Sequence, residues 1–147
     1  MIILKTFYIF KLNKNYIDIA KKTPNNIFIL LSSINNHDKE NIIEAFDLFN
    51  EICLPINVEF FDDFIFKKLN NYDSYTKFKS VHMYNDYLND EISKMNINYS
   101  HIKIKSNKND NVFINNLYNL GDLFMCDFNN DFYEYLINRE KIISKRI

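Results

Sequence analysis

Glycine is nearly absent from this sequence: its 147 residues include one glycine, two prolines and no tryptophan. A loop that holds phosphate groups by close backbone approach needs several glycines, so P-loop and dinucleotide-binding sites are excluded. Apolar runs of about 20 residues, the length that spans a bilayer, are also absent. Lys5 and Lys11 interrupt the apolar N-terminal stretch, and no small-residue cleavage site follows it. We therefore expect a soluble, cytoplasmic protein without a membrane partner.

Net charge is also small, since 18 basic and 19 acidic residues leave −1 at neutral pH. Such a balance does not steer a protein towards DNA or an anionic membrane. The lysines at 67–68, 77–79 and 103–105 are scattered along the chain, so we predict no direct nucleic-acid contact. The two cysteines, Cys53 and Cys126, lie far apart and outside any metal-binding spacing. We predict two buried free thiols, as in a reducing compartment.

Aromatic and aliphatic residues are plentiful: 47% of the chain is hydrophobic and 16% is aromatic. This composition and length predict one domain over residues 1–147 with its own core. Strand and helix patterns follow the order β-α-α-β-α-β-α-β-β. We therefore predict an α+β fold, with a small, mostly antiparallel sheet, about four helices and a C-terminal β-hairpin. We expect a monomer in which the basic residues 138–147 form a frayed tail.

The first half of the chain contains one strand pattern and several helical patterns. Residues 6–12, TFYIFKL, are dense in aromatic and β-branched residues, as in a strand buried on both faces. Helical spacing follows, with Asn15 as the predicted N-cap. Pro24 interrupts this helix or begins another. The further helices predicted here run over 25–35 and from Asp38, as N-cap, to Cys53, ahead of Pro55.

The second half has more mixed patterns. Ile56, Val58 and Phe60 alternate, which predicts a strand that residues 64–69 either extend or follow with a short helix. Residues 99–106 alternate as a half-buried strand does. The remaining predictions are a loop over 70–79, a helix over 81–95, a helix over 112–120 that Gly121 ends, and strands over 123–128 and 132–137.

The stretch LFMCDFNNDFYEYL, residues 123–136, is either an acidic catalytic cluster or a hairpin. Asn and Asp tolerate left-handed backbone angles, which favours a turn at 129–131. Asp127 and Asp131 then flank the turn, and Glu134 faces solvent. We predict the hairpin, with no catalytic residue in it.

A metal-dependent enzyme is a weaker hypothesis. It would use Asp63, Asp127 and His101, because carboxylates and imidazole are common metal ligands. Asp62 and Asp63 would point in opposite directions on a strand, so at most one of them joins Asp127. We predict no metal, no cofactor and no catalytic site. A small aromatic-rich domain of this kind is more typical of protein binding, and Tyr16, at the start of the first helix, is the best anchor. The alternative is that Tyr16 is a half-buried residue at the edge of the core.

Four stretches, in this order and spacing, resemble the sporulation inhibitor of replication (SirA) family. They are FYIFKL followed by a helix that opens on an aromatic residue; EICLPI (51–56); HIKIK with FINNLYNL; and DFNNDFYEYL. In the last stretch, Cys126 stands where the family has an aromatic residue.

The resemblance implies a non-catalytic inhibitor that binds the N-terminal domain of the replication initiator DnaA. The implied contact surface is the first helix, with two aromatic residues one turn apart. Tyr16 matches the first of these, and Ala20 occupies the second position without being aromatic. We predict that Asn13, Lys14 and Ile17 flank this surface. A phage or mobile-element module that binds another host factor is the alternative.

Overall fold

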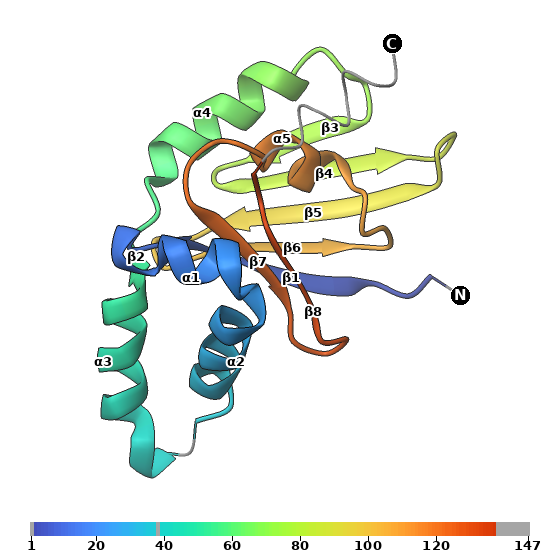
Figure 1. Ribbon diagram of the computed structural model, residues 1–147. Coiled ribbons are helices and arrows are strands. Elements are labelled where there is room, and N and C mark those ends of the chain that lie inside the picture. The colour runs from blue at the N-terminus through green and yellow to red at the C-terminus, as the bar shows by residue number, and fades with distance from the viewer. Residues whose placement is uncertain (1, 38, 138–147) are drawn as a thin grey trace.

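An antiparallel sheet of eight strands forms the body of the computed structural model, which describes residues 2–37 and 39–137 (Figure 1). The strand order is β3-β4-β5-β6-β1-β7-β8, and β2 pairs with β1 at the edge of the helical layer. The α+β class and the C-terminal hairpin are confirmed, and the tail at 138–147 lies outside the described residues. The strands are β1 (Lys5–Leu12), β2 (Cys53–Leu54), β3 (Tyr75–Phe78), β4 (Val81–Asp86), β5 (Glu91–Ile97), β6 (Ile102–Ser106), β7 (Leu123–Asp127) and β8 (Phe132–Tyr135).

Within the described residues, five α-helices cover parts of both faces of the sheet, where the sequence predicted about four. Figure 1 shows α4 and α5 near the β3–β5 end, and α1, α2 and α3 gathered at the other. The helices are α1 (Ile17–Lys22), α2 (Pro24–Asn35), α3 (Ile42–Ile52), α4 (Val58–Leu69) and α5 (Val112–Leu117), with 3-10 turns η1 (Lys14–Tyr16) and η2 (Lys39–Asn41). No described helix has the length and apolar character that crossing a membrane requires.

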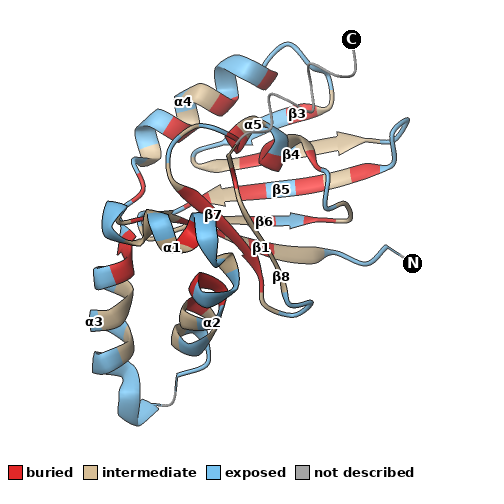
Figure 2. Ribbon diagram, viewed as in Figure 1, coloured by how far each residue is buried: buried red, intermediate tan, exposed pale blue. Residues whose placement is uncertain are grey.

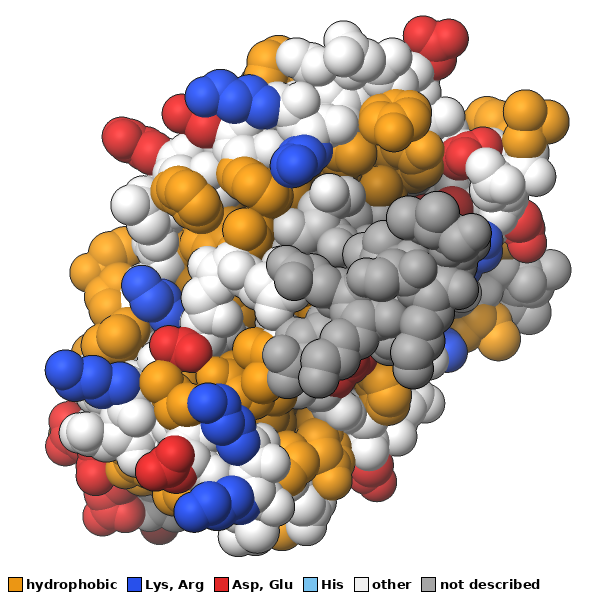
Figure 3. Space-filling view, turned by 45° about the horizontal axis from the view of Figure 1, so that its top comes forward, with side chains coloured by type: hydrophobic (Ala, Val, Ile, Leu, Met, Phe, Trp, Pro, Cys, Tyr) orange, Lys and Arg blue, Asp and Glu red, His pale blue; other side chains and the backbone are white. Residues whose placement is uncertain are grey.

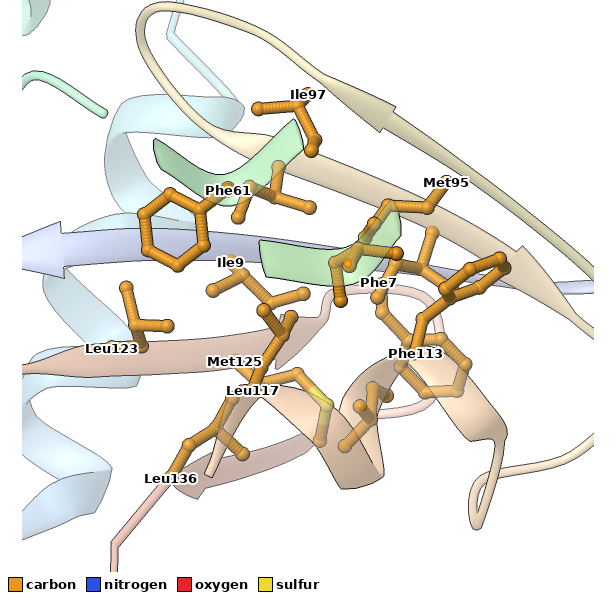
Figure 4. Close-up of a cluster of buried hydrophobic side chains, with 14 of the residues drawn as sticks. Phe7, Ile9, Phe61, Met95, Ile97, Phe113, Leu117, Leu123, Met125 and Leu136 are labelled. Atoms are coloured by element: carbon orange, nitrogen blue, oxygen red, sulfur yellow. The ribbon is translucent and has the colours of Figure 1, made fainter. Parts of the chain in front are cut away.

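The central strand β1 is covered on both faces, as its sequence predicted. Phe7 and Ile9 belong to a core cluster with α4 and α5, and Figure 4 shows them beside Phe113 and Leu117 of α5. Phe10 points the other way, into a second cluster with α1 and α2. Figure 2 shows the buried residues concentrated in the strands and on the helix faces turned towards them. The two-sided burial explains why β1 has a nearly continuous apolar sequence.

The strand predicted at 56–60 is wrong, because α4 begins at Val58. The side chain of Asn57 accepts a hydrogen bond from the Phe60 N–H at 3.1 Å and so caps the helix. Phe61, Ile65 and Leu69 are the buried residues of α4, and their spacing of four is helical. The apolar residues at 56–60 alternate because Ile56 lies just before the helix, and Val58 and Phe60 lie in its first turn.

The helix predicted over 81–95 is also wrong, since these residues form β4, a turn and most of β5. In β5, alternate residues are buried, beginning with Glu91 and Ser93. These two polar residues occupy inward positions that an apolar pattern does not register. The predicted loop at 70–79 contains β3, which pairs with β4.

Other differences lie at element ends. Asn13, not Asn15, caps the first helical turn. Helix α5 stops at Leu117, so Gly121, with φ +136°, lies in the following loop rather than at a helix end.

The turn before β8 is confirmed, and Asp127 accepts hydrogen bonds from the Asn129 and Asn130 N–H groups. Glu134 is half-buried and accepts a hydrogen bond from Tyr118, which corrects its predicted solvent-facing position.

Candidate partner-binding surface

The first helical turn is attached to the end of α3. The Asn13 N–H donates to the Ile52 carbonyl at 2.7 Å, and the Asn13 side chain accepts from the Asn15 N–H at 3.2 Å. The Tyr16 N–H donates to the Asn13 carbonyl at 2.9 Å and closes the turn. This capping fixes the direction in which the chain leaves β1, and therefore the position of Tyr16.

Tyr16 is half-buried, and its hydroxyl points to α3. The Tyr16 Oη donates a hydrogen bond to Glu51 Oε1 at 2.9 Å. This bond, together with some burial and the nearby negative charge of Glu51, raises the pKa of Tyr16. The ring packs against the second core cluster. Tyr16 is therefore held in one orientation with part of its ring exposed, which is the state of a pre-organised binding anchor.

The other predicted residues differ in exposure. Lys14 is exposed, while Asn13 and Ile17 are half-buried. Ala20 is 1% exposed and packs within the second cluster, so its methyl group offers almost no surface to a partner. It also borders an open hollow of about 810 Å³ whose other walls include Tyr133 and Tyr135. Four of the five residues thus reach the surface, and Ala20 lies beneath it.

Helix α3 presents an apolar face to solvent. Ile42, Ile43 and Phe46 are 56%, 73% and 66% exposed, and Ile52 is the one buried residue of the helix. Figure 2 shows α3 projecting from the sheet with most of its length exposed or half-buried. Exposed apolar side chains in one place are typical of an interaction surface. The face that carries α4 differs, because Figure 3 shows its hydrophobic side chains interspersed with charges of both signs.

Phe46 lies within this apolar face, between Ile42 and Ile43 around the helix, and Tyr16 lies beyond Ile43 on the side of Glu51. At 100° per residue, the position of Ile43 on α3 falls between those of Phe46 and Glu51. Because Tyr16 is bonded to Glu51, a partner meets both aromatic rings if it covers α3 from Phe46 past Ile43 as far as Glu51. Beyond Phe46, a hollow of about 180 Å³ continues the apolar surface to Tyr99, which is 71% exposed.

The sequence could have shown the α3 surface. The apolar positions of α3, from Leu48 round to Ile43, span about 220° of the helix circumference. One sheet cannot bury so wide an arc, so part of it must face solvent or a partner. In the structure, Ile42, Ile43 and Phe46 lie on the exposed part of this arc.

The residues of the metal-site hypothesis do not come together. Asp63 is exposed on α4, Asp127 is buried and binds its own turn, and His101 contacts the Tyr8 ring at 5.5 Å. Within residues 2–37 and 39–137, no group of three or more His, Cys, Asp or Glu side chains is placed to hold a metal ion. The arrangement of these three residues gives no support to the hypothesis.

The nearest approach to a catalytic constellation is a buried polar network under α4. Tyr75 Oη lies 2.7 Å from His82 Nδ1, and His82 Nε2 lies 2.8 Å from Asp62 Oδ1. Ser80 donates to the other Asp62 oxygen at 2.7 Å, so the hydroxyl contacts the carboxylate and not the imidazole. A serine nucleophile needs the imidazole as its base, and this order does not provide it. The network ties α4 to β3 and β4.

Both cysteines are free and buried, as predicted. Burial raises the pKa of Cys53 to about 12 and raises the pKa of Cys126 further. The reactive thiolate is therefore scarce at neutral pH, which is the property of a structural cysteine.

Comparison with known proteins adds no identity: no protein-family model matches this chain, and no curated protein matches it.

Proposed function

We propose that this chain is a cytoplasmic, non-catalytic inhibitor of replication initiation that binds the N-terminal domain of DnaA. The choice of partner is supported by the resemblance of four sequence stretches to the SirA family. The choice of surface is supported by one observation: Tyr16 is fixed by Glu51 at the flank of an exposed apolar helix. Inhibition is steric, because the inhibitor occupies a surface that the assembling initiation complex needs.

In this proposal, Phe46 supplies the second aromatic anchor that the resemblance places at position 20. Ala20 is buried and cannot fill that role, whereas Phe46 is 66% exposed. Aromatic side chains at the centre of an interface often contribute about 2 kcal/mol or more each. That free energy corresponds to a change of about 30-fold in Kd. Lys14 and Asn13 would form part of the polar rim.

The functional test is expression of the protein in growing Firmicute cells, with the ratio of origin to terminus DNA as the readout. We expect the ratio to fall when the wild-type chain is expressed, because fewer initiations occur. The Tyr16→Ala variant should leave the ratio near its uninduced value. Tyr72→Ala is the matched control, since Tyr72 is 55% exposed on the distant α4–β3 connection.

An unchanged ratio with wild-type protein at comparable abundance would contradict the proposal. Growth inhibition without a change in the ratio would favour the alternative, a phage or mobile-element module that acts on another host factor. Equal loss of effect in the Tyr16 and Tyr72 variants would show that the readout follows protein stability rather than the surface.

A further inference from the structure

One face of the sheet carries side chains in rows that cross five strands. The pairing of β3 with β4, β5, β6 and β1 places five residues in one row: Phe78, Val81, Asn96, Lys103 and Tyr8. None of them is buried. Helices α4 and α5 pack on the opposite face, against the alternate residues of the same strands.

A second row lies beside the first on the same face. The same pairings place Thr76, Met83, Lys94, Lys105 and Thr6 side by side, and again none is buried. With neighbouring strands about 4.8 Å apart, the two rows form a platform about 19 Å across. Neither row contains an aspartate or a glutamate.

Three lysines converge at the centre of this platform. Lys94, Lys103 and Lys105 line a shallow hollow of about 140 Å³ with Asn96. Among the described residues, no ion pair joins Lys94, Lys103 or Lys105 to a carboxylate. Three uncompensated positive charges on adjacent strands repel each other and favour an anionic ligand. The chain as a whole has a net charge of −1, so the positive sign is local to this surface.

Aromatic rings lie at both ends of the first row of the platform. Phe78 is 72% exposed at the β3 end, and the Lys79 ammonium lies 5.5 Å from the centre of its ring. Tyr8 lies at the β1 end, with the Lys103 ammonium 5.7 Å from its ring centre. Tyr8 is half-buried, whereas Phe78 offers an exposed flat ring. An exposed ring on the same surface as lysines is suited to a ligand that has both phosphates and planar bases.

We propose that this platform binds single-stranded nucleic acid, with the phosphates on Lys94, Lys103 and Lys105 and a base stacked on Phe78. A sheet face with exposed aromatics and basic side chains receives unpaired bases, whereas duplex bases are already stacked. This inference runs against the expectation of no direct nucleic-acid contact, which stays a prediction that the test below decides. The scattered lysines of the sequence are brought together by the register of β5 and β6. The proposal does not depend on binding to DnaA.

The test is fluorescence anisotropy with a labelled oligothymidylate of about 15 nucleotides, within the usual range of single-strand site sizes. We expect a Kd on the order of 10 µM or tighter at low salt, and weaker binding to a duplex of the same length. The triple variant Lys94→Gln, Lys103→Gln, Lys105→Gln should bind at least tenfold more weakly. Because each phosphate contact contributes about −0.7 to the salt slope, the variant's slope should be shallower by about 2.

A control with the same change in charge separates the platform from general electrostatics. It is the triple variant Lys21→Gln, Lys67→Gln, Lys68→Gln, whose exposed lysines lie on α1 and α4. Equal weakening in both triple variants would overturn the proposal, as would the absence of wild-type binding at low salt. Phe78→Ala should lower affinity for the oligonucleotide but not for inorganic polyphosphate. An equal effect on both, or no effect on either, would mean that the platform binds phosphate without reading bases.

The lysine variants distinguish a failure of the nucleic-acid proposal from a failure of the proposed function. A titration with the DnaA domain contains no nucleic acid, and the Lys94, Lys103 and Lys105 substitutions lie outside the Tyr16 surface. Circular dichroism of each variant confirms that a loss of binding is not a loss of fold.

Discussion

At the scale of single residues, His82 shows how the core holds polar groups. It is 0% exposed, and each ring nitrogen has a partner. The carboxylate of Asp62 accepts from Nε2–H, so Nδ1 is left as the acceptor for the Tyr75 hydroxyl. The neutral ring is thus fully satisfied by a fixed tautomer.

Replacing Tyr75 with phenylalanine should destabilise the protein, because Nδ1 of His82 would lose its donor in a buried site. An unsatisfied buried acceptor costs about 1–3 kcal/mol. Urea unfolding of Tyr75→Phe is the measurement, with Tyr72→Phe as control, since Tyr72 is 55% exposed. Equal stability of the two variants would contradict the account of this network.

Stability should fall as the pH drops below about 6.5. Burial lowers the pKa of His82, an effect that Lys77 reinforces and Asp62 opposes, and burial also lowers the pKa of His101. Below the ordinary histidine value of 6.5, the unfolded chain then binds more protons than the folded one. The free energy of unfolding therefore decreases from neutral pH downward until the folded histidines are protonated as well.

Urea unfolding at a series of pH values between neutrality and the range where carboxylates titrate measures this dependence. The His82→Gln variant should show a shallower dependence than wild type, whatever its absolute stability. A free energy of unfolding that stays constant or rises on acidification would show that the histidines are not the controlling groups.

The candidate binding residues show which properties of a single position can be predicted from the sequence. Tyr16 could be chosen from the sequence because an aromatic residue opens a helix there, but its degree of exposure could not be predicted. Its bond to Glu51 was not predictable, because the two residues are 35 positions apart. The burial of Ala20 and the exposure of Phe46 likewise depend on how α1 and α3 sit on the sheet.

At the scale of elements, α4 depends on its cap. Replacing Asn57 with alanine removes the side-chain acceptor for the Phe60 N–H and should cost about 1 kcal/mol. Asn71→Ala is the control, since Asn71 is exposed and lies outside the helix. Chemical denaturation measures both. If Asn57→Ala is as stable as the control, the helix does not rely on this cap.

Elements were predictable from sequence where one face was apolar and the other polar. Residues 25–35 followed their predicted period, and so did 102–106 of the strand predicted over 99–106, which begins three residues later than expected. The errors at 56–60 and 81–95 share a cause: in both segments, the local spacing of apolar residues does not match the residues that the fold buries. Glu91 is polar yet buried because its carboxylate accepts hydrogen bonds from Ser93 and from the Val112 N–H. Such a partner comes from a distant segment and leaves no local signal.

At the scale of the whole molecule, composition and element order were enough for the α+β class, but not for the strand order. That order places β1, the first strand in sequence, between β6 and β7. It also determines both proposed surfaces. Register aligns the lysines of β5 and β6, and the attachment of η1 to the end of α3 sets Tyr16 beside an exposed apolar helix.

The central claim is that the chain binds the N-terminal domain of DnaA through the Tyr16 flank of α3. Isothermal titration of the purified chain into that domain tests it most directly, with Tyr16→Ala, Phe46→Ala and the control Tyr72→Ala measured in parallel. We predict micromolar or tighter binding, weakened about 30-fold or more by either the Tyr16 or the Phe46 substitution and unchanged by the control. The absence of measurable binding at tens of micromolar by the folded wild-type protein would contradict the account.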